Sequence, residues 1–63
     1  MRKFDIVLSP SEWESLRPTI KMLQREKTLK YEPCGYYDKV LIICECTEDA
    51  EKIIDNELEK ILG

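Results

Sequence analysis

The chain has no histidine among its 63 residues, and it has few of the other features that catalytic sites need. Histidine is the usual general base near neutral pH and a common metal ligand. The sequence also contains no G-x-S-x-G motif, no phosphate-binding loop and no metal triad. Its carboxylates fall on predicted helix surfaces, where burial does not tune their acidity. The sequence therefore predicts a non-enzymatic protein without catalytic residues.

There are only three cysteines, and an odd number does not make a disulfide framework. Cys44 and Cys46 are two positions apart on a predicted strand, so their Cα atoms should be roughly 6.5–7 Å apart, at or beyond disulfide reach. A zinc site needs four converging ligands, whereas a buried cysteine ordinarily behaves as a small hydrophobe. We expect reduced thiols, no bound metal or cofactor, and a cytoplasmic protein. Cys34, in a predicted turn, should be exposed.

Long apolar runs are missing as well. No stretch approaches the roughly 18 residues of a membrane span, and the apolar residues 6–8 are too few for a signal peptide. The length predicts a single small domain, residues 1–63, which is marginally stable alone because it buries only about 60% of its unfolded surface. The content of Lys, Glu and Ile also suits a thermophile.

The formal charge of −3 is unevenly distributed. Residues 1–30 carry seven basic and four acidic side chains, whereas residues 31–63 carry three basic and nine acidic ones. The two halves therefore differ in sign, at +3 and −6. This asymmetry bears on the choice of partners rather than on the fold.

The longest apolar run, residues 40–46, is rich in β-branched residues and too short for a buried helix, so it predicts a strand. Because strand side chains alternate between faces, Leu41 and Ile43 lie opposite to the face shared by Val40, Ile42, Cys44 and Cys46. Residues 3–8 alternate in the same way, with Phe4, Ile6 and Leu8 on one side and Val7 on the other. Both faces of the long strand are apolar, so both should be covered.

Two helices are predicted by their caps and apolar stripes. Ser9 and Glu12 form a capping box around Pro10, and a stripe of Trp13, Leu16, Ile20 and Leu23 continues to about residue 27. Pro18 should cause a kink or a restart near residue 17. Thr47 caps the second helix, whose stripe comprises Ala50, Ile53, Ile54, Leu58, Ile61 and Leu62.

Between the helices, residues 28–32 predict a strand. Pro33 either ends this strand or restricts it to an edge of the sheet. Turns are expected at residues 33–35 and 37–39.

These elements predict an α+β fold of order β-α-β-β-α, with a three-stranded, mainly antiparallel sheet and both helices packed on one face. Residues 40–46 form the central strand. The face that carries Val7, Leu41 and Ile43, with a tyrosine as a further candidate, then has no cover within the chain. We expect association there, as a homodimer or as a small subunit bound to another protein. The alternative is a modest patch shielded by the stems of Lys3, Lys30 and Lys39.

Two charged helix faces give other hypotheses. One face of the first helix is basic, with Arg17, Lys21 and Arg25 spaced four residues apart, and Lys27 and Lys30 extend the row. This face could contact nucleic acid or an acidic partner. The tyrosines at positions 31, 36 and 37 could then stack on bases. The acidic second helix could meet a basic partner, or act as a viral-type inhibitor of a host protein. It could also meet the basic helix of another copy. Either helix face could equally be an ordinary solvated surface.

The order of elements, with a sheet face free to pair, resembles the small dimerising subunit of the KEOPS tRNA-modification complex. The last helix, residues 49–62, is similar in placement and in its apolar stripe. The stretch from residue 18 to residue 29 is longer here than in that family. The resemblance covers the whole chain in element order, and it implies a dimeric accessory protein.

Overall fold

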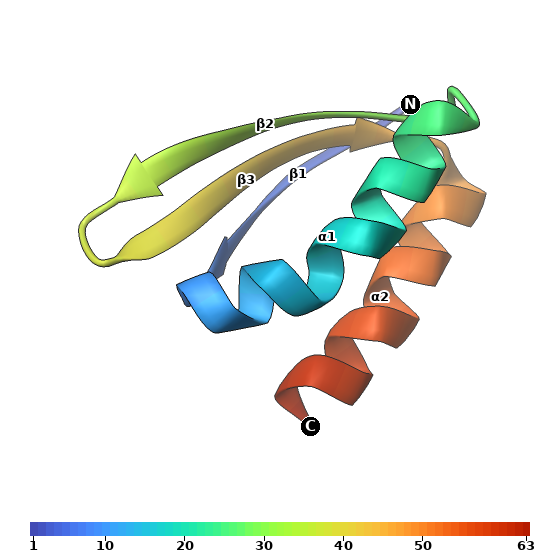
Figure 1. The fold of residues 1–63 in the computed structure, drawn as a ribbon. Coiled ribbons are helices and arrows are strands. Elements are labelled where there is room, and N and C mark those ends of the chain that lie inside the picture. Colours follow the sequence, from blue (N-terminus) through green and yellow to red (C-terminus); the bar gives the residue numbers. More distant parts are fainter.

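The computed structural model describes residues 1–63 and contains three strands and two helices. The strands are β1 (Arg2–Leu8), β2 (Leu29–Tyr36) and β3 (Lys39–Cys46), and the helices are α1 (Pro10–Arg25) and α2 (Glu48–Leu62). The sheet has the order β1-β3-β2, and both pairings are antiparallel. Both helices lie on the same side of the sheet (Figure 1). The predicted α+β fold, with its β-α-β-β-α order and central long strand, is confirmed.

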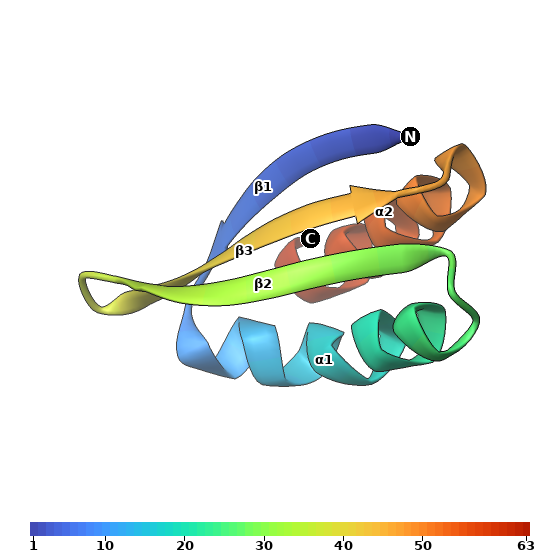
Figure 2. The ribbon, with the colours of Figure 1, turned by 90° about the horizontal axis from the view of Figure 1, so that it is seen from above.

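The core lies between the sheet and the two helices. In β3, the side chains of Ile42, Cys44 and Cys46 are fully buried, as the alternation in the sequence predicts. The helices contribute Leu16, Ile20, Leu23, Ala50 and Ile54, and the outer strands contribute Leu8 and Leu29. Because neither helix crosses to the other side of the sheet, this is the only core that the chain builds (Figures 1 and 2).

Helix α1 begins with the predicted capping box. The N–H of Ser9 donates to Oε1 of Glu12 (2.8 Å), and the N–H of Glu12 donates to Oγ of Ser9 (3.2 Å). Pro18 lies inside the helix, and Figure 1 shows the helix changing direction about midway while remaining continuous. The bend follows because proline lacks a donor and crowds the preceding turn. The predicted kink is therefore seen, and the restart is not.

The helix ends at Arg25, two residues before the predicted end. Lys27 adopts a positive φ of 64°, and the N–H groups of Lys27 and Thr28 donate to the carbonyls of Gln24 (3.0 Å) and Leu23 (3.1 Å). This pair of hydrogen bonds is the Schellman motif, in which glycine usually occupies the left-handed position. Because Lys27 takes that position here, no glycine in the sequence indicated where the helix ends.

Strand β2 was predicted too short. It continues through Pro33 to Tyr36, so the turn expected at residues 33–35 was wrong, and the one expected around residues 37–39 is the hairpin turn. Pro33 is tolerated because β2 is an edge strand, where a missing N–H breaks no ladder if it points outward. Tyr36 pairs with Lys39, and Tyr37 adopts a positive φ of 58° between them.

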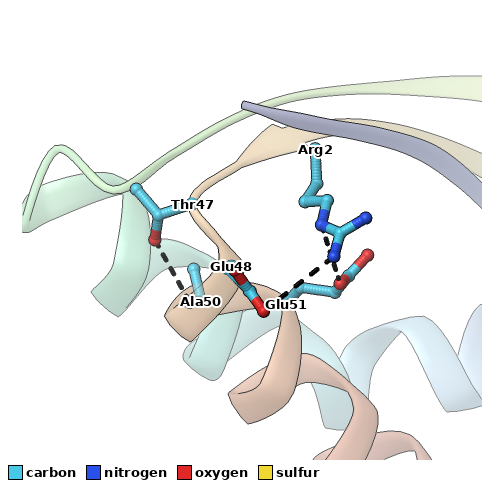
Figure 3. Close-up of polar contacts among 5 residues, drawn as sticks. All are labelled: Arg2, Thr47, Glu48, Ala50 and Glu51. Carbon is cyan, nitrogen blue, oxygen red and sulfur yellow. Dashed lines mark hydrogen bonds and ion pairs between the residues drawn. The ribbon is translucent and has the colours of Figure 1, made fainter.

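Helix α2 begins at the predicted cap, where Oγ1 of Thr47 accepts from the N–H of Ala50 (3.2 Å). Figure 3 shows Arg2 of β1 reaching the same helix turn, where its guanidinium pairs with Glu51 (3.6 Å) and Glu48 (3.9 Å). The predicted apolar stripe is only partly covered. Ala50 and Ile54 are buried and Leu58 and Ile61 are partly buried, but Ile53 and Leu62 are exposed. The chain has no further element to cover these two residues.

Candidate functional site

The side of the sheet that faces away from the helices is covered by no element of the chain (Figure 1). We call it the open face. The strand registers place eleven side chains on it: Lys3, Asp5, Val7, Lys30, Glu32, Cys34, Tyr36, Lys39, Leu41, Ile43 and Glu45.

The predicted interface residues lie together on the open face. Val7 is directly opposite Leu41 in the β1–β3 ladder, Cys34 is opposite Leu41 on the other side, and Ile43 is two residues further along β3. Val7 and Ile43 are each 46% exposed, and Leu41 is half-buried. These four residues form the open-face patch. Its apolar side chains are neighbours because cross-strand partners on one face are only about 5 Å apart.

Charged residues surround the open-face patch in matched numbers. Lys3 and Lys30 lie opposite Glu45 from the two outer strands, and Asp5 and Glu32 lie opposite Ile43. Lys39 lies at the other end of β3, opposite Tyr36. Three lysines therefore face three carboxylates across this surface, which makes it neutral although the whole chain carries −3. An apolar centre with a mixed polar rim is the arrangement of a protein interface.

The lysine stems do not close over the patch. Lys3, Lys30 and Lys39 all lie on the open face, as the shielding hypothesis requires. However, an open depression of about 290 Å³ lies between Lys3 and Lys30, with Ile43 and Glu45 among its lining residues. Ile43 keeps nearly half of its surface exposed beside these stems. Shielding by lysine is therefore incomplete at the centre of the face.

Cys34 was missed as a member of this surface, and Tyr36 is the tyrosine that was expected there only as a further candidate. Their strand was expected to end at residue 32, so Cys34 was placed in a turn, whereas it is half-buried in β2. The sequence carried little signal for this extension, because Lys30 and Glu32 are polar whereas Cys34 and Tyr36, on the same side of the strand, are not. Tyr36 is 47% exposed and widens the apolar surface toward the hairpin turn.

The predicted basic residues of α1 do share one surface. Arg17, Lys21 and Arg25 line an open groove of about 390 Å³ together with Pro18 and Met22. Glu14 is also in this groove and pairs with Arg17 at 3.2 Å, which offsets part of the positive charge.

The predicted extension of this basic groove was wrong in part. Lys30 lies on the open face opposite Glu45 rather than in line with α1, because β2 begins at Leu29 and turns away from the helix. The tyrosines do not gather near the groove either. Tyr31 packs on the helix side against Trp13 (ring centroids 6.0 Å apart), whereas Tyr36 and Tyr37 pack on each other at the hairpin turn (4.9 Å). That turn lies at the opposite end of the molecule from the C-terminal end of α1 (Figure 1).

The thiols of β3 are in surroundings that disfavour ionisation. Burial raises the pKa of the Cys44 thiol to about 11, and the nearby Cys46 and Asp5 act in the same direction. Burial also raises the pKa of Cys46, with Glu51 and Asp55 adding to the effect. All three cysteines are free, and no three acidic or sulfur ligands converge as a metal site would require. Neither helix has both the length and the apolar character to cross a membrane.

No protein-family model matches this chain, and no curated protein or solved structure shows significant similarity to it. The resemblance to the KEOPS subunit therefore stays a similarity in the order of elements.

Proposed function

We propose that this chain is a non-enzymatic protein–protein interaction module, a homodimer or a small subunit of a larger complex, which associates through its open face. One observation carries the proposal. The open-face patch exposes adjacent apolar side chains at the centre of the sheet, and no element of the chain covers them. A 63-residue domain has a small core of its own, so burying this face against another protein would add stability.

The neutral rim supports the same proposal. Opposite charges alternate around the patch, so a partner with a complementary rim would be oriented by charge and held by apolar contact. The three free cysteines suit a reducing compartment, and we place the protein in the cytoplasm on that ground.

The experiment compares two exposed isoleucines. Ile43→Lys places a cation at the centre of the open face, whereas Ile53→Lys makes the same change on α2, at a residue 39% exposed. Pull-down from the native host, and sedimentation where the partner at the open face is a second copy, should show an association through the open face that Ile43→Lys abolishes and Ile53→Lys preserves. A monomer with no captured partner, or equal effects of the two changes, would contradict the proposal.

A second candidate, nucleic-acid binding, is favoured by the groove that Arg17, Lys21 and Arg25 share. Phosphate contacts would make the affinity fall with salt. Arg17→Glu combined with Lys21→Glu should then abolish binding to a single-stranded RNA probe, while Ile43→Lys leaves it unchanged. The acidic inhibitor hypothesis predicts instead a single captured protein, which is lost when α2 carboxylates such as Asp55 and Glu59 are changed to amides.

A further inference from the structure

The two edges of the sheet are built differently. The β2 edge contains Pro33, which has no N–H to donate, and Gly35. The β1 edge has seven residues with no proline and no glycine, and it pairs with β3 in unbroken register from Arg2 to Leu8. In Figure 2, β1 lies at the margin of the sheet with no element beside its outer side. A regular, uncovered edge of this kind is a template for pairing with another strand.

Two apolar side chains of β1 keep exposed surface that a neighbouring strand could bury. Phe4 and Ile6 point to the helix side and are only partly buried against the core. At the start of the strand, Arg2 is held to α2 by its pairs with Glu51 and Glu48 (Figure 3). These surface ion pairs add little stability, but they offset acidic charge of α2 beside the edge.

The order of charged residues along β1 favours a second copy of β1 as the strand that pairs with this edge. In an antiparallel pairing of two β1 strands about a two-fold axis, a register centred on Phe4 places Lys3 opposite Asp5 of the second copy, and does so twice. Centring the register on Asp5 or on Lys3 places like charges opposite each other, and centring it on Ile6 leaves Asp5 facing Val7 without a cation. Opposite charges at facing positions stabilise a strand pair, and like charges destabilise it.

We propose that β1 pairs with β1 of a second copy in the register centred on Phe4, which joins two chains into one six-stranded sheet. The two Phe4 rings meet at the axis on the helix side, where contact completes their burial. An axis perpendicular to the sheet keeps both open faces on the same side. The dimer therefore presents two open-face patches on one surface. The β1 edge, where the two copies meet, is distinct from that surface.

The test uses charge reversal and mixing. Asp5→Lys alone gives Lys opposite Lys, and Lys3→Asp alone gives Asp opposite Asp, so each variant should dimerise about tenfold more weakly than the parent or not at all. An equimolar mixture of the two variants restores both opposite-charge pairs, and it should form a heterodimer that native mass spectrometry resolves.

Lys30→Asp is the matched control. Lys30 mirrors Lys3 across Glu45 on the same open face, but it lies on the β2 edge. Edge pairing predicts that Lys30→Asp dimerises like the parent. If Lys30→Asp weakens association as much as Lys3→Asp does, the copies meet through the open face and the edge proposal is wrong.

Hydrogen exchange of the unmodified protein provides a measurement that does not depend on a variant folding. Raising the protein concentration should slow exchange at amides of β1, and leave the amides of β2 unchanged. A parent protein that stays monomeric up to millimolar concentration, unchanged β1 exchange, or a mixture that yields no heterodimer would each overturn the proposal.

Discussion

Asp5 lies directly across the β1–β3 ladder from Ile43, and Glu32 lies opposite the same residue from β2. The most exposed apolar side chain of the central strand thus has a carboxylate on each side. This arrangement has a consequence for the stability of any charged variant at position 43, because facing charges on adjacent strands interact directly.

We expect Ile43→Lys to fold and Ile43→Glu to be the less stable of the two by about 1–2 kcal/mol, since two cross-strand pairs contribute up to about 1 kcal/mol each. The lysine sits between Asp5 and Glu32, whereas the glutamate adds a third carboxylate. Urea denaturation followed by circular dichroism measures the difference, which should shrink at high salt. Equal unfolding midpoints for the two variants would show that these carboxylates do not act on position 43.

Lys27→Gly should stabilise the protein by about 1 kcal/mol, because Lys27 adopts the left-handed conformation that costs a residue with a Cβ about that much. Thermal unfolding measures the gain as a rise in Tm. Lys27→Ala is the control, since alanine removes the charge but keeps the Cβ, and it should bring no such rise. An equal rise for both would point to charge rather than to backbone conformation.

Glu12 should make the stability depend on acid pH. Its pKa is lowered by the hydrogen bond from the backbone of Ser9, and further by the Ser9 side chain, so folding favours the ionised form. The stabilisation is complete above the unfolded-state pKa of about 4.3, and it is lost as the pH falls through the lower folded-state pKa.

Glu12→Gln tests this dependence because it keeps an acceptor oxygen but does not titrate. The parent should exceed the variant in urea midpoint at neutral pH, and the excess should decrease in acid. A constant difference between the two proteins at neutral and acid pH would exclude Glu12 as the titrating group.

The three thiols should differ sharply in reactivity. Cys44 and Cys46 have no exposed surface, and burial raises the pKa of both, so little reactive thiolate forms near neutral pH. Cys34 lies on the open face and is half-buried. Alkylation followed by mass spectrometry should give one label in the native protein and three in denaturant. Rapid labelling of Cys44 under native conditions would mean that β3 opens readily.

Residues that act through their neighbours in sequence were predictable. The capping box of Ser9 and Glu12, the cap at Thr47 and the bend at Pro18 each depend on contacts within one or two helical turns. The alternation in residues 40–46 likewise separated Ile42, Cys44 and Cys46 from Leu41 and Ile43 before any neighbour strand was known. Three members of the open-face patch, Val7, Leu41 and Ile43, were predicted from the alternation in residues 3–8 and 40–46, and Cys34 was not.

Tertiary structure decided what local pattern could not. Pro33 and Gly35 favour turns by local chemistry, yet the strand continues through them to Tyr36. Pairing with β3 stabilises the extended conformation by more than the turn preference of these two residues destabilises it. Whether Ile53 and Leu62 are covered depends on where α2 lies relative to α1 and the sheet, and no periodicity records that. The sequence by itself determined the elements and the apolar face that each one presents. Only the packing decided which faces are covered, and it left Val7, Leu41 and Ile43 without cover from this chain because both helices lie on the same side of the sheet.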